Sequence, residues 1–145
     1  ITYGRLYNWY VADNNPTTRL ESNGGKNVCP TGWHVPSHSE WSTLTTYLGG
    51  FDIAGGKLKE TGTIHWTSPN TGATNESGFT ALPGGARNTA SNFAFIGIYA
   101  YWWSTDQTTA SNAWSPGLAH NNEQGLYMND INKSDGISIR CIRDN

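Results

Sequence analysis

Two cysteines near opposite ends of this 145-residue chain constrain its fold more than any other feature. Cys29 opens residues 29–36 (CPTGWHVP), and Cys141 lies in residues 137–144 (ISIRCIRD). A bond between them would close most of the chain into one loop, which the chain-entropy model credits with roughly 4–5 kcal/mol of stability. Such a bond persists in an oxidising compartment, so the pair bears on location as well as on fold. The alternative is two unrelated buried thiols. The disulfide is favoured because nothing near either cysteine indicates catalysis or metal binding.

The composition indicates one loop-rich domain spanning residues 1–145. Seven Trp, seven Tyr and 17 Gly occur in a chain with only 14% charged residues. Gly, Asn and Ser favour turns, and large aromatic side chains can fill a core built from few regular elements. A chain of this length buries roughly two thirds of its unfolded surface. The first residue is Ile1 rather than methionine, so we expect a processed protein or an excised domain. The composition, rich in Gly, Asn, Thr and Ser and poor in Lys and Glu, favours a working environment outside the cytoplasm.

The charge and hydropathy of the chain exclude two classes of partner. The net charge is −2, which provides no basic surface for nucleic acid. No apolar run approaches the roughly 18 residues that a membrane span needs, so we expect no membrane insertion by this domain.

Local signals predict an α+β fold with one or two short helices. The stronger helix begins after Ser37, which forms a capping box with Glu40, and an apolar stripe follows. Gly49-Gly50 ends this helix. A weaker helix is predicted for residues 53–60, where two adjacent glycines lower the helix propensity.

The remaining elements are predicted to be short strands and long ordered loops. Residues 1–12 alternate like a strand, and a polar loop then runs to residue 27. Residues 61–85 are rich in turn formers and contain only one Asp, Glu, Lys or Arg residue, Glu76, which predicts an ordered loop. The last third predicts a small twisted antiparallel sheet that ends in a buried strand carrying Cys141. The runs predicted to form this sheet are residues 93–98, 99–104, 113–118, 125–128 and 136–142.

Several blocks of sequence resemble one known family, the Fibrobacter succinogenes major paralogous domain. They occur in the expected order and extend over nearly the whole chain. These blocks are residues 29–36 (CPTGWHVP), Glu40-Trp41, 54–59 (AGGKLK), 75–79 (NESGF), 81–85 (ALPGG), 101–105 (YWWST) and 139–144 (IRCIRD).

The resemblance implies a C-type-lectin-like fold, close to the formylglycine-generating-enzyme architecture. It also implies a secreted or cell-surface protein of gut or rumen bacteria, or a component of their phage particles. The role implied by the family is binding rather than catalysis.

The sequence departs from the family pattern between the Ala113-Trp114 phrase and the final strand. Related lectin-like domains are targets of diversity-generating retroelements, which rewrite asparagine codons in this part of the fold. We therefore hypothesise that residues 115–132 form a diversified ligand face, while drift in a surface loop is the alternative. Amide and tyrosine side chains offer adaptable hydrogen bonding beside rigid contact area. The candidate ligand-binding residues are Trp114, His120, Asn121, Asn122, Gln124, Tyr127, Asn129, Asp130 and Asn132.

Catalysis is not the expected function. Formylglycine-generating relatives need two reactive cysteines, and both cysteines here are better explained by a structural bond. Cys29 with His34 could form a nucleophile and base, but a bonded sulfur is not a nucleophile. The scattered carboxylates do not indicate the paired acids of a glycosidase, although a carbohydrate-active enzyme remains an alternative.

No metal or cofactor site is predicted from the sequence. The four histidines lack the spacing of a zinc site. Asn129 and Asp130 fall short of the six to eight oxygens that calcium takes, so a structural calcium is left open rather than predicted. We expect an exported module that binds a glycan or a surface protein of another cell. The alternative from another class is a self-associating subunit of a surface filament.

Overall fold

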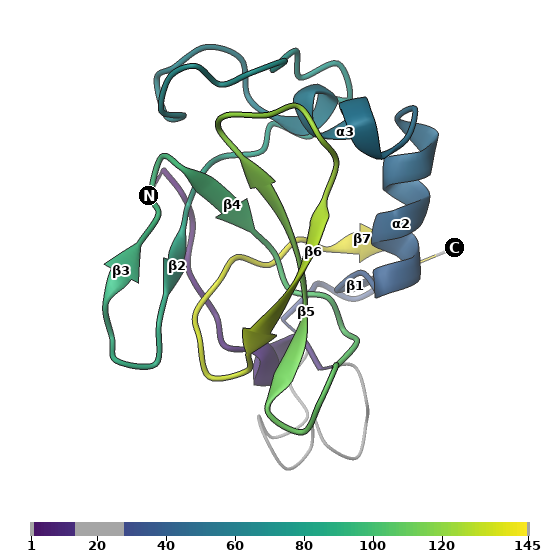
Figure 1. Cartoon of the computed structure of the whole chain (residues 1–145). Coiled ribbons are helices and arrows are strands. Elements are labelled where there is room, and N and C mark those ends of the chain that lie inside the picture. Colours follow the sequence, from purple (N-terminus) through teal and green to yellow (C-terminus); the bar gives the residue numbers. More distant parts are fainter. Residues whose placement is uncertain (1, 14–27, 145) are drawn as a thin grey trace.

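The structure, a computed structural model, describes residues 2–13 and 28–144. Within these residues it has a 3-10 helix, two α-helices and seven short strands, which is the predicted α+β content (Figure 1). The elements are η1 (Trp9–Val11), β1 (Trp33–His34), α2 (His38–Tyr47), α3 (Phe51–Leu58), β2 (Ala86–Arg87), β3 (Phe93–Ala94), β4 (Tyr99–Tyr101), β5 (Asn112–Ala119), β6 (Tyr127–Asn132) and β7 (Ile142–Arg143).

Helix α2 begins and ends where local signals predict. The Ser37 hydroxyl accepts from the Glu40 amide at 3.3 Å, and the Glu40 carboxylate accepts from the Ser37 amide at 2.8 Å. Gly49 and Gly50 then adopt φ values of 102° and 95°, in the left-handed half of backbone space. The capping box and the glycine stop are both confirmed. The second helix covers Phe51–Leu58, two residues earlier than predicted.

The predicted strand over residues 1–12 is wrong. Most of this segment is irregular, and Trp9–Val11 forms η1 instead. Among the described residues 2–12, only Tyr7 makes a β-bridge, to Ile137. The Trp9 indole is buried and donates to the Ser104 carbonyl at 2.9 Å, so a tertiary contact far along the chain overrides the local alternation. The predicted polar loop over residues 14–27 lies outside the described residues.

The strands form three small antiparallel sheets rather than the single sheet predicted. Strand β5 pairs with β4 on one side and β6 on the other, while β2 pairs with β3 and β1 with β7. The last strand, β7, is exposed and not buried, which corrects the prediction. Inward-facing Ile137 is fully buried, but alternation along the extended chain turns Ile142 outward, where it is 39% exposed.

The interior consists of two apolar clusters on either side of the adjacent Trp102 and Trp103. The helix-side cluster, which lies beneath α2 and α3, includes Trp41, Leu58, Trp66, Trp102 and Leu118. The N-terminal cluster includes Trp9, Val35, Trp103, Ala113 and Ile137. Successive residues of an extended chain point to opposite sides, which explains how two neighbouring indoles serve different clusters.

The two cysteines are bonded, which confirms the favoured prediction. The Cα atoms of Cys29 and Cys141 lie 5.8 Å apart, and the bond joins residues separated by 112 positions. Cys29 is buried in the N-terminal cluster, and Cys141 packs against it. The disulfide therefore ties β1 and β7 to the cluster beside them.

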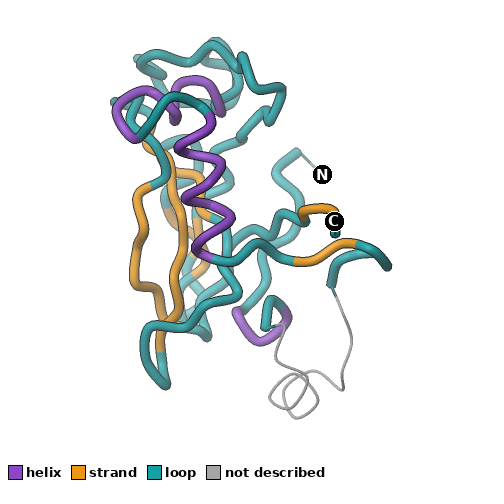
Figure 2. The backbone as a smooth tube through the Cα atoms, turned by 90° about the vertical axis from the view of Figure 1, so that its right-hand side faces the viewer, coloured by secondary structure: helices purple, strands orange, loops and turns teal. Residues whose placement is uncertain are grey.

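Residues 61–85 form the ordered loop that the composition predicts. The Trp66 indole is buried and donates to the Ala81 carbonyl at 2.8 Å. The Asn70 amide donates to the carbonyls of Glu60 and Gly62. In this loop, hydrogen bonds from buried side chains to the main chain take the place of the main-chain hydrogen bonds of helices and sheets. Figures 1 and 2 show this long loop beside α3 at the end of the molecule where β5 turns into β6.

Candidate functional site

The β4–β5–β6 sheet has one covered face and one partly open face. Leu118 of β5 points toward α2 and α3, and its cross-strand partner Ala100 lies in the same cluster. On the opposite face, Ala113 and Ile131 pack against the N-terminal cluster and cover one half of the sheet. The other half of that face stays open.

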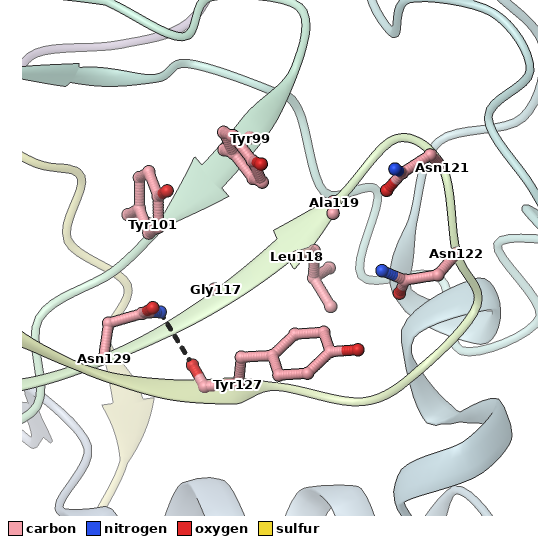
Figure 3. Close-up of a pocket in the computed structure, with 9 residues that line it drawn as sticks. All are labelled: Tyr99, Tyr101, Gly117, Leu118, Ala119, Asn121, Asn122, Tyr127 and Asn129. Atoms are coloured by element: carbon pink, nitrogen blue, oxygen red, sulfur yellow. Dashed lines mark hydrogen bonds between the residues drawn. The ribbon is translucent and has the colours of Figure 1, made fainter.

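A pocket of about 250 Å³ occupies this open half (Figure 3). Tyrosine and asparagine side chains dominate its lining. The described residues that line the pocket include no Asp, Glu, Lys, Arg or His, so none of their side chains is ionised at neutral pH. The lining residues are Tyr99, Tyr101, Gly117, Leu118, Ala119, Asn121, Asn122, Tyr127 and Asn129.

Gly117 lets two polar side chains close over the middle strand. A Cβ atom at this position would lie 2.8 Å from Cδ1 of Tyr101 and 3.0 Å from Nδ2 of Asn129. Gly117 pairs with Tyr101 on β4 and with Tyr127 on β6, so it is the centre of the three-strand row. A larger residue here would push the Tyr101 ring outward and fill the floor of the pocket.

The tyrosines of β4 form a rigid aromatic wall. The rings of Tyr99 and Tyr101 are stacked, with centroids 5.6 Å apart and planes 28° apart. Burial, with a smaller contribution from Tyr99, raises the pKa of Tyr101 to about 12. The Tyr101 phenol therefore keeps its proton at neutral pH and can donate a hydrogen bond to a ligand.

The amides are oriented by hydrogen bonds to the main chain. The Asn129 amide nitrogen donates to the carbonyls of Ser115 and Tyr127, at 3.1 and 3.0 Å. The Asn122 side-chain oxygen accepts from the Gln124 amide at 3.1 Å, and the Tyr127 hydroxyl donates to the Gln124 side chain. Asn129 thus offers its oxygen to a ligand and Asn122 its NH₂ group.

A buried lysine holds the loop that carries Asn121 and Asn122. Lys59, directly after α3, has no exposed surface. Its ammonium donates to the carbonyls of Thr71, Ala119 and Asn122 at 2.8, 3.1 and 2.7 Å. Burial lowers the pKa of Lys59 to about 8, and the Glu123 carboxylate opposes this, so the ammonium is charged at neutral pH.

Two glycines of α3 allow the same loop to pack closely against the helix. A Cβ at Gly55 would lie 1.7 Å from the Gln124 carbonyl oxygen, and the Gly56 amide donates to the Glu123 carbonyl at 3.0 Å. The loop therefore meets the body of the protein mainly through main-chain atoms. Side chains at its exposed positions, such as Asn121, can change without loss of these anchors.

Comparison with known families agrees with this reading of the sequence blocks. The Fibrobacter succinogenes major domain matches residues 1–143, almost the entire chain. The chain belongs to this family. A comparison with curated proteins finds no match.

In this member of the Fibrobacter succinogenes major domain family, the predicted ligand residues divide into two groups. Asn121, Asn122, Tyr127 and Asn129 line the pocket together. Gln124 joins them through the Tyr127 hydroxyl. His120 lies at the loop entrance, where its ring Nδ1 faces the Ser68 carbonyl at 3.2 Å.

The other predicted residues of this family member lie away from the pocket. Trp114 stacks on His38 of α2, with centroids 5.4 Å apart, on the covered face of the sheet. Hydrogen bonds from Thr108 and then Asn112 lower the pKa of the exposed Asp130. The Asn132 side chain accepts from the Ser134 amide at 2.9 Å in the turn after β6. These three residues have local structural partners instead of a shared cavity.

Sequence reasoning missed Tyr99, Tyr101, Gly117 and Lys59. The alternation Tyr99-Ala100-Tyr101 was a usable signal, because it places both phenols on one face of a strand and the small residue in the core. Lys59 had no such signal. Its burial depends on carbonyls from distant segments, which no local pattern reports.

The described residues contain no group of three or more His, Cys, Asp and Glu side chains that could hold a metal ion. Asn129 and Asp130 are adjacent on β6 and point to opposite faces, so they do not converge on one ion. Nor does any helix in residues 2–13 and 28–144 have the length and hydropathy to cross a membrane.

A second cavity, of about 320 Å³, separates α2 from the C-terminal segment. Trp41 and Phe79 line it together with Arg140. The Arg140 guanidinium lies 4.5 Å from the centre of the Phe79 ring and donates to the Phe79 carbonyl at 3.0 Å. Glu40 also lines this cavity, and its carboxylate is bonded to Ser37 and His34, so both charged groups of the cavity are already engaged with the protein.

Proposed function

We propose that this domain is a ligand-binding module of an exported bacterial or phage surface protein. The ligand is a glycan or a surface protein of another cell, and it binds in the pocket on the open half of the β4–β5–β6 sheet. One observation carries the proposal: phenol rings and oriented amides converge on a pocket whose described lining bears no charged side chain.

The chemistry of the lining supports recognition over catalysis. General acid–base and nucleophilic mechanisms use carboxylate, imidazole, amine or thiol groups at the reacting atoms. The groups gathered here are hydroxyl, amide and aromatic. They suit hydrogen bonding and stacking to an uncharged ligand, as in antibody loops rich in Tyr and Asn.

The rigid mounting of the site also supports a binding role. Lys59 and the α3 glycines fix the loop backbone, while Asn121 and Glu123 on the same loop are exposed. Such a loop loses little conformational entropy when a ligand binds. This arrangement also supports our proposal of a diversified ligand face within residues 115–132, confined to its exposed positions because most of β5 is buried.

Export and a C-type-lectin-like fold are parts of the same proposal. The Cys29–Cys141 bond favours an oxidising environment. The pairing of β1 with β7, which brings together distant parts of the chain beside this bond, supports the lectin-like assignment.

The test is a glycan and surface-protein array probed with the folded domain, with and without calcium. Tyr101→Phe and Asn122→Ala each remove one hydrogen-bonding group, so we expect each to weaken binding by about two- to tenfold. His38→Ala, on the helix side of the sheet, is the matched control and should bind like the unchanged domain. Binding that ignores both pocket variants would place the site elsewhere.

A further inference from the structure

The pocket is the middle of a longer row of aromatic rings. Phe95, which follows β3, contacts Tyr99 edge-on with centroids 5.5 Å apart. At the other end Phe51, the first residue of α3, contacts Tyr127 edge-on with centroids 5.0 Å apart. Phe95 and Phe51 are 51% and 42% exposed, although each carries a large apolar ring.

The row crosses all three strands. Tyr101 and Tyr127 occupy the two outer strands and face each other across Gly117 of β5. Neighbouring strands lie about 4.8 Å apart, so the two tyrosine backbones are separated by roughly 10 Å. The glycine allows the Tyr101 ring to lie close over β5, which narrows the gap between the two halves of the row.

Polar groups are interleaved with the rings. Asn129 lies beside Tyr101 in the lining, and Asn122 lies on the loop above Tyr127 (Figure 3). A ligand that fits this surface must present flat apolar faces and uncharged hydroxyl groups in alternation along its length. A sugar ring does so, because its axial C–H groups form an apolar face and its hydroxyl groups lie around the edge.

We propose that the ligand of this site is a linear, uncharged glycan that lies along the aromatic row Phe95–Tyr99–Tyr101–Tyr127–Phe51. This inference rests on the proposed binding function and names its ligand class. Stacked single-stranded nucleic acid also uses aromatic rows, but it requires a cationic groove. The net charge of −2 and the uncharged lining disfavour that ligand, and they disfavour anionic polysaccharides for the same reason.

The extended row makes a prediction that a single-sugar pocket does not. A monosaccharide reaches only the centre, whereas a longer chain also covers the rings at the two ends. Affinity should therefore rise with chain length until the row is filled. The Phe95→Ala and Phe51→Ala variants should then weaken binding of long chains by roughly two- to tenfold each, the range expected for loss of one aromatic contact. The loss should be larger for long chains than for the monosaccharide, which reaches only the centre of the row.

The experiment is calorimetric titration of the intact domain with size series of neutral cello-, xylo-, manno- and malto-oligosaccharides, from monosaccharide to hexasaccharide. Tyr47→Ala is the control, because Tyr47 is an 86% exposed aromatic residue on α2, outside the row. It should match the unchanged domain at every length. Thermal unfolding of each variant shows that the domain remains folded.

The outcomes separate this inference from the proposed function. Length-dependent affinity that falls in Phe95→Ala and Phe51→Ala, but not in Tyr47→Ala, supports the extended glycan. Glycan binding that is sensitive to Tyr101→Phe but independent of chain length overturns the extended row and leaves the binding function intact. If the domain binds only a surface protein through the same pocket, the glycan inference is also overturned and the binding function is kept. Ligand binding that no pocket variant affects overturns both.

Discussion

Lys59 stabilises the loop beside the pocket of the β4–β5–β6 sheet without lining the pocket. Its ammonium has three donors, and each donates to a main-chain carbonyl from a different position in the chain: Thr71, Ala119 and Asn122. The Trp66 ring lies 5.5 Å from the nitrogen and adds a favourable cation–π contact. A buried cation is costly unless its donors are satisfied, so this lysine is tolerated because it joins two segments of the chain, at residue 71 and at residues 119–122.

Lys59→Met keeps most of the apolar stem but removes the donor to three main-chain carbonyls, that of Ala119 buried and those of Thr71 and Asn122 partly buried. We expect the free energy of unfolding to fall by about 3 kcal/mol, since each unsatisfied buried group costs on the order of 1–3 kcal/mol. The measurement is equilibrium unfolding in urea. Lys57→Met is the matched control: its ion pair with Glu76, at 3.5 Å, is at the surface and is worth less than about 1 kcal/mol. Equal losses in the two variants would contradict the proposed role of Lys59.

At the residue scale, the sequence predicts chemistry better than position. The amides and Tyr127 were predicted as ligand groups from their residue types, and the structure brings several of them together in one pocket. Lys57 and Lys59 look alike in the sequence, although Lys57 is only partly buried and Lys59, two residues later, is fully buried. The two lysines differ because the segments at residue 71 and residues 119–122 pack around Lys59 and accept its hydrogen bonds.

At the scale of elements, His34 joins strand β1, helix α2 and the C-terminal segment. Its Nδ1 lies 2.6 Å from an Asp144 oxygen, and its Nε2 lies 2.8 Å from a Glu40 oxygen. Only the imidazolium form can donate from both nitrogens at once. The hydrogen bonds to Asp144 and then to Glu40 raise the pKa of His34, outweighing the effect of burial.

Stability should therefore depend on pH in a defined direction. A raised folded-state pKa means that the contribution of His34 is complete below the ordinary value of 6.5 and is lost as pH rises through the folded value. Burial alone would raise the pKa of Glu40, but hydrogen bonds from Ser37 and His34 lower it. The Glu40 contribution is thus present above its ordinary value of 4.5 and is lost as pH falls through the lower folded value.

His34→Gln removes the titrating group and keeps a polar side chain. We expect its deficit in unfolding free energy, relative to the unchanged domain, to be largest between pH 4.5 and 6.5 and to shrink at higher pH. Urea unfolding across a pH series measures it. His120→Gln is the matched control, because it removes a histidine whose ring Nδ1 faces a main-chain carbonyl rather than a carboxylate. A deficit that is constant with pH would mean that His34 acts by packing alone.

Elements with local signals were predictable, and elements that depend on distant partners were not. Helix α2 follows from the capping box and the glycine pair, both within a few residues of its ends. The segment at residues 1–12 alternates like a strand, but within the described residues 2–12 only Tyr7 makes a β-bridge, and the Trp9 indole holds the segment through its bond to Ser104. Pairing of two-residue strands such as β1 and β7 depends on the disulfide and the clusters beside them, not on propensity.

For the whole molecule, the disulfide supplements a core divided into two clusters. Regular structure is sparse, and the strands outside the three-stranded sheet are two residues long. Few strand–strand hydrogen bonds stabilise such a chain. A larger share of its stability therefore comes from the disulfide, which restricts the conformations of the unfolded state. The cysteine pair was predictable from the sequence because the chain has two cysteines in separate, distinctive phrases. The division of the core was not, because it depends on how the strands group into sheets.

The Cys29→Ala/Cys141→Ala double variant should lose about 4 kcal/mol of unfolding free energy, the entropy of a loop of this size. Its urea dependence should also steepen, because an unfolded chain without the crosslink exposes more surface. The change in slope separates an effect on the unfolded state from simple loss of packing around Cys29. Reduction of the unchanged domain with dithiothreitol should reproduce both changes. Alkylation of either thiol in native, unreduced protein would contradict the bond. A reduced domain with undiminished stability would remove the physical basis for placing this protein in an oxidising environment.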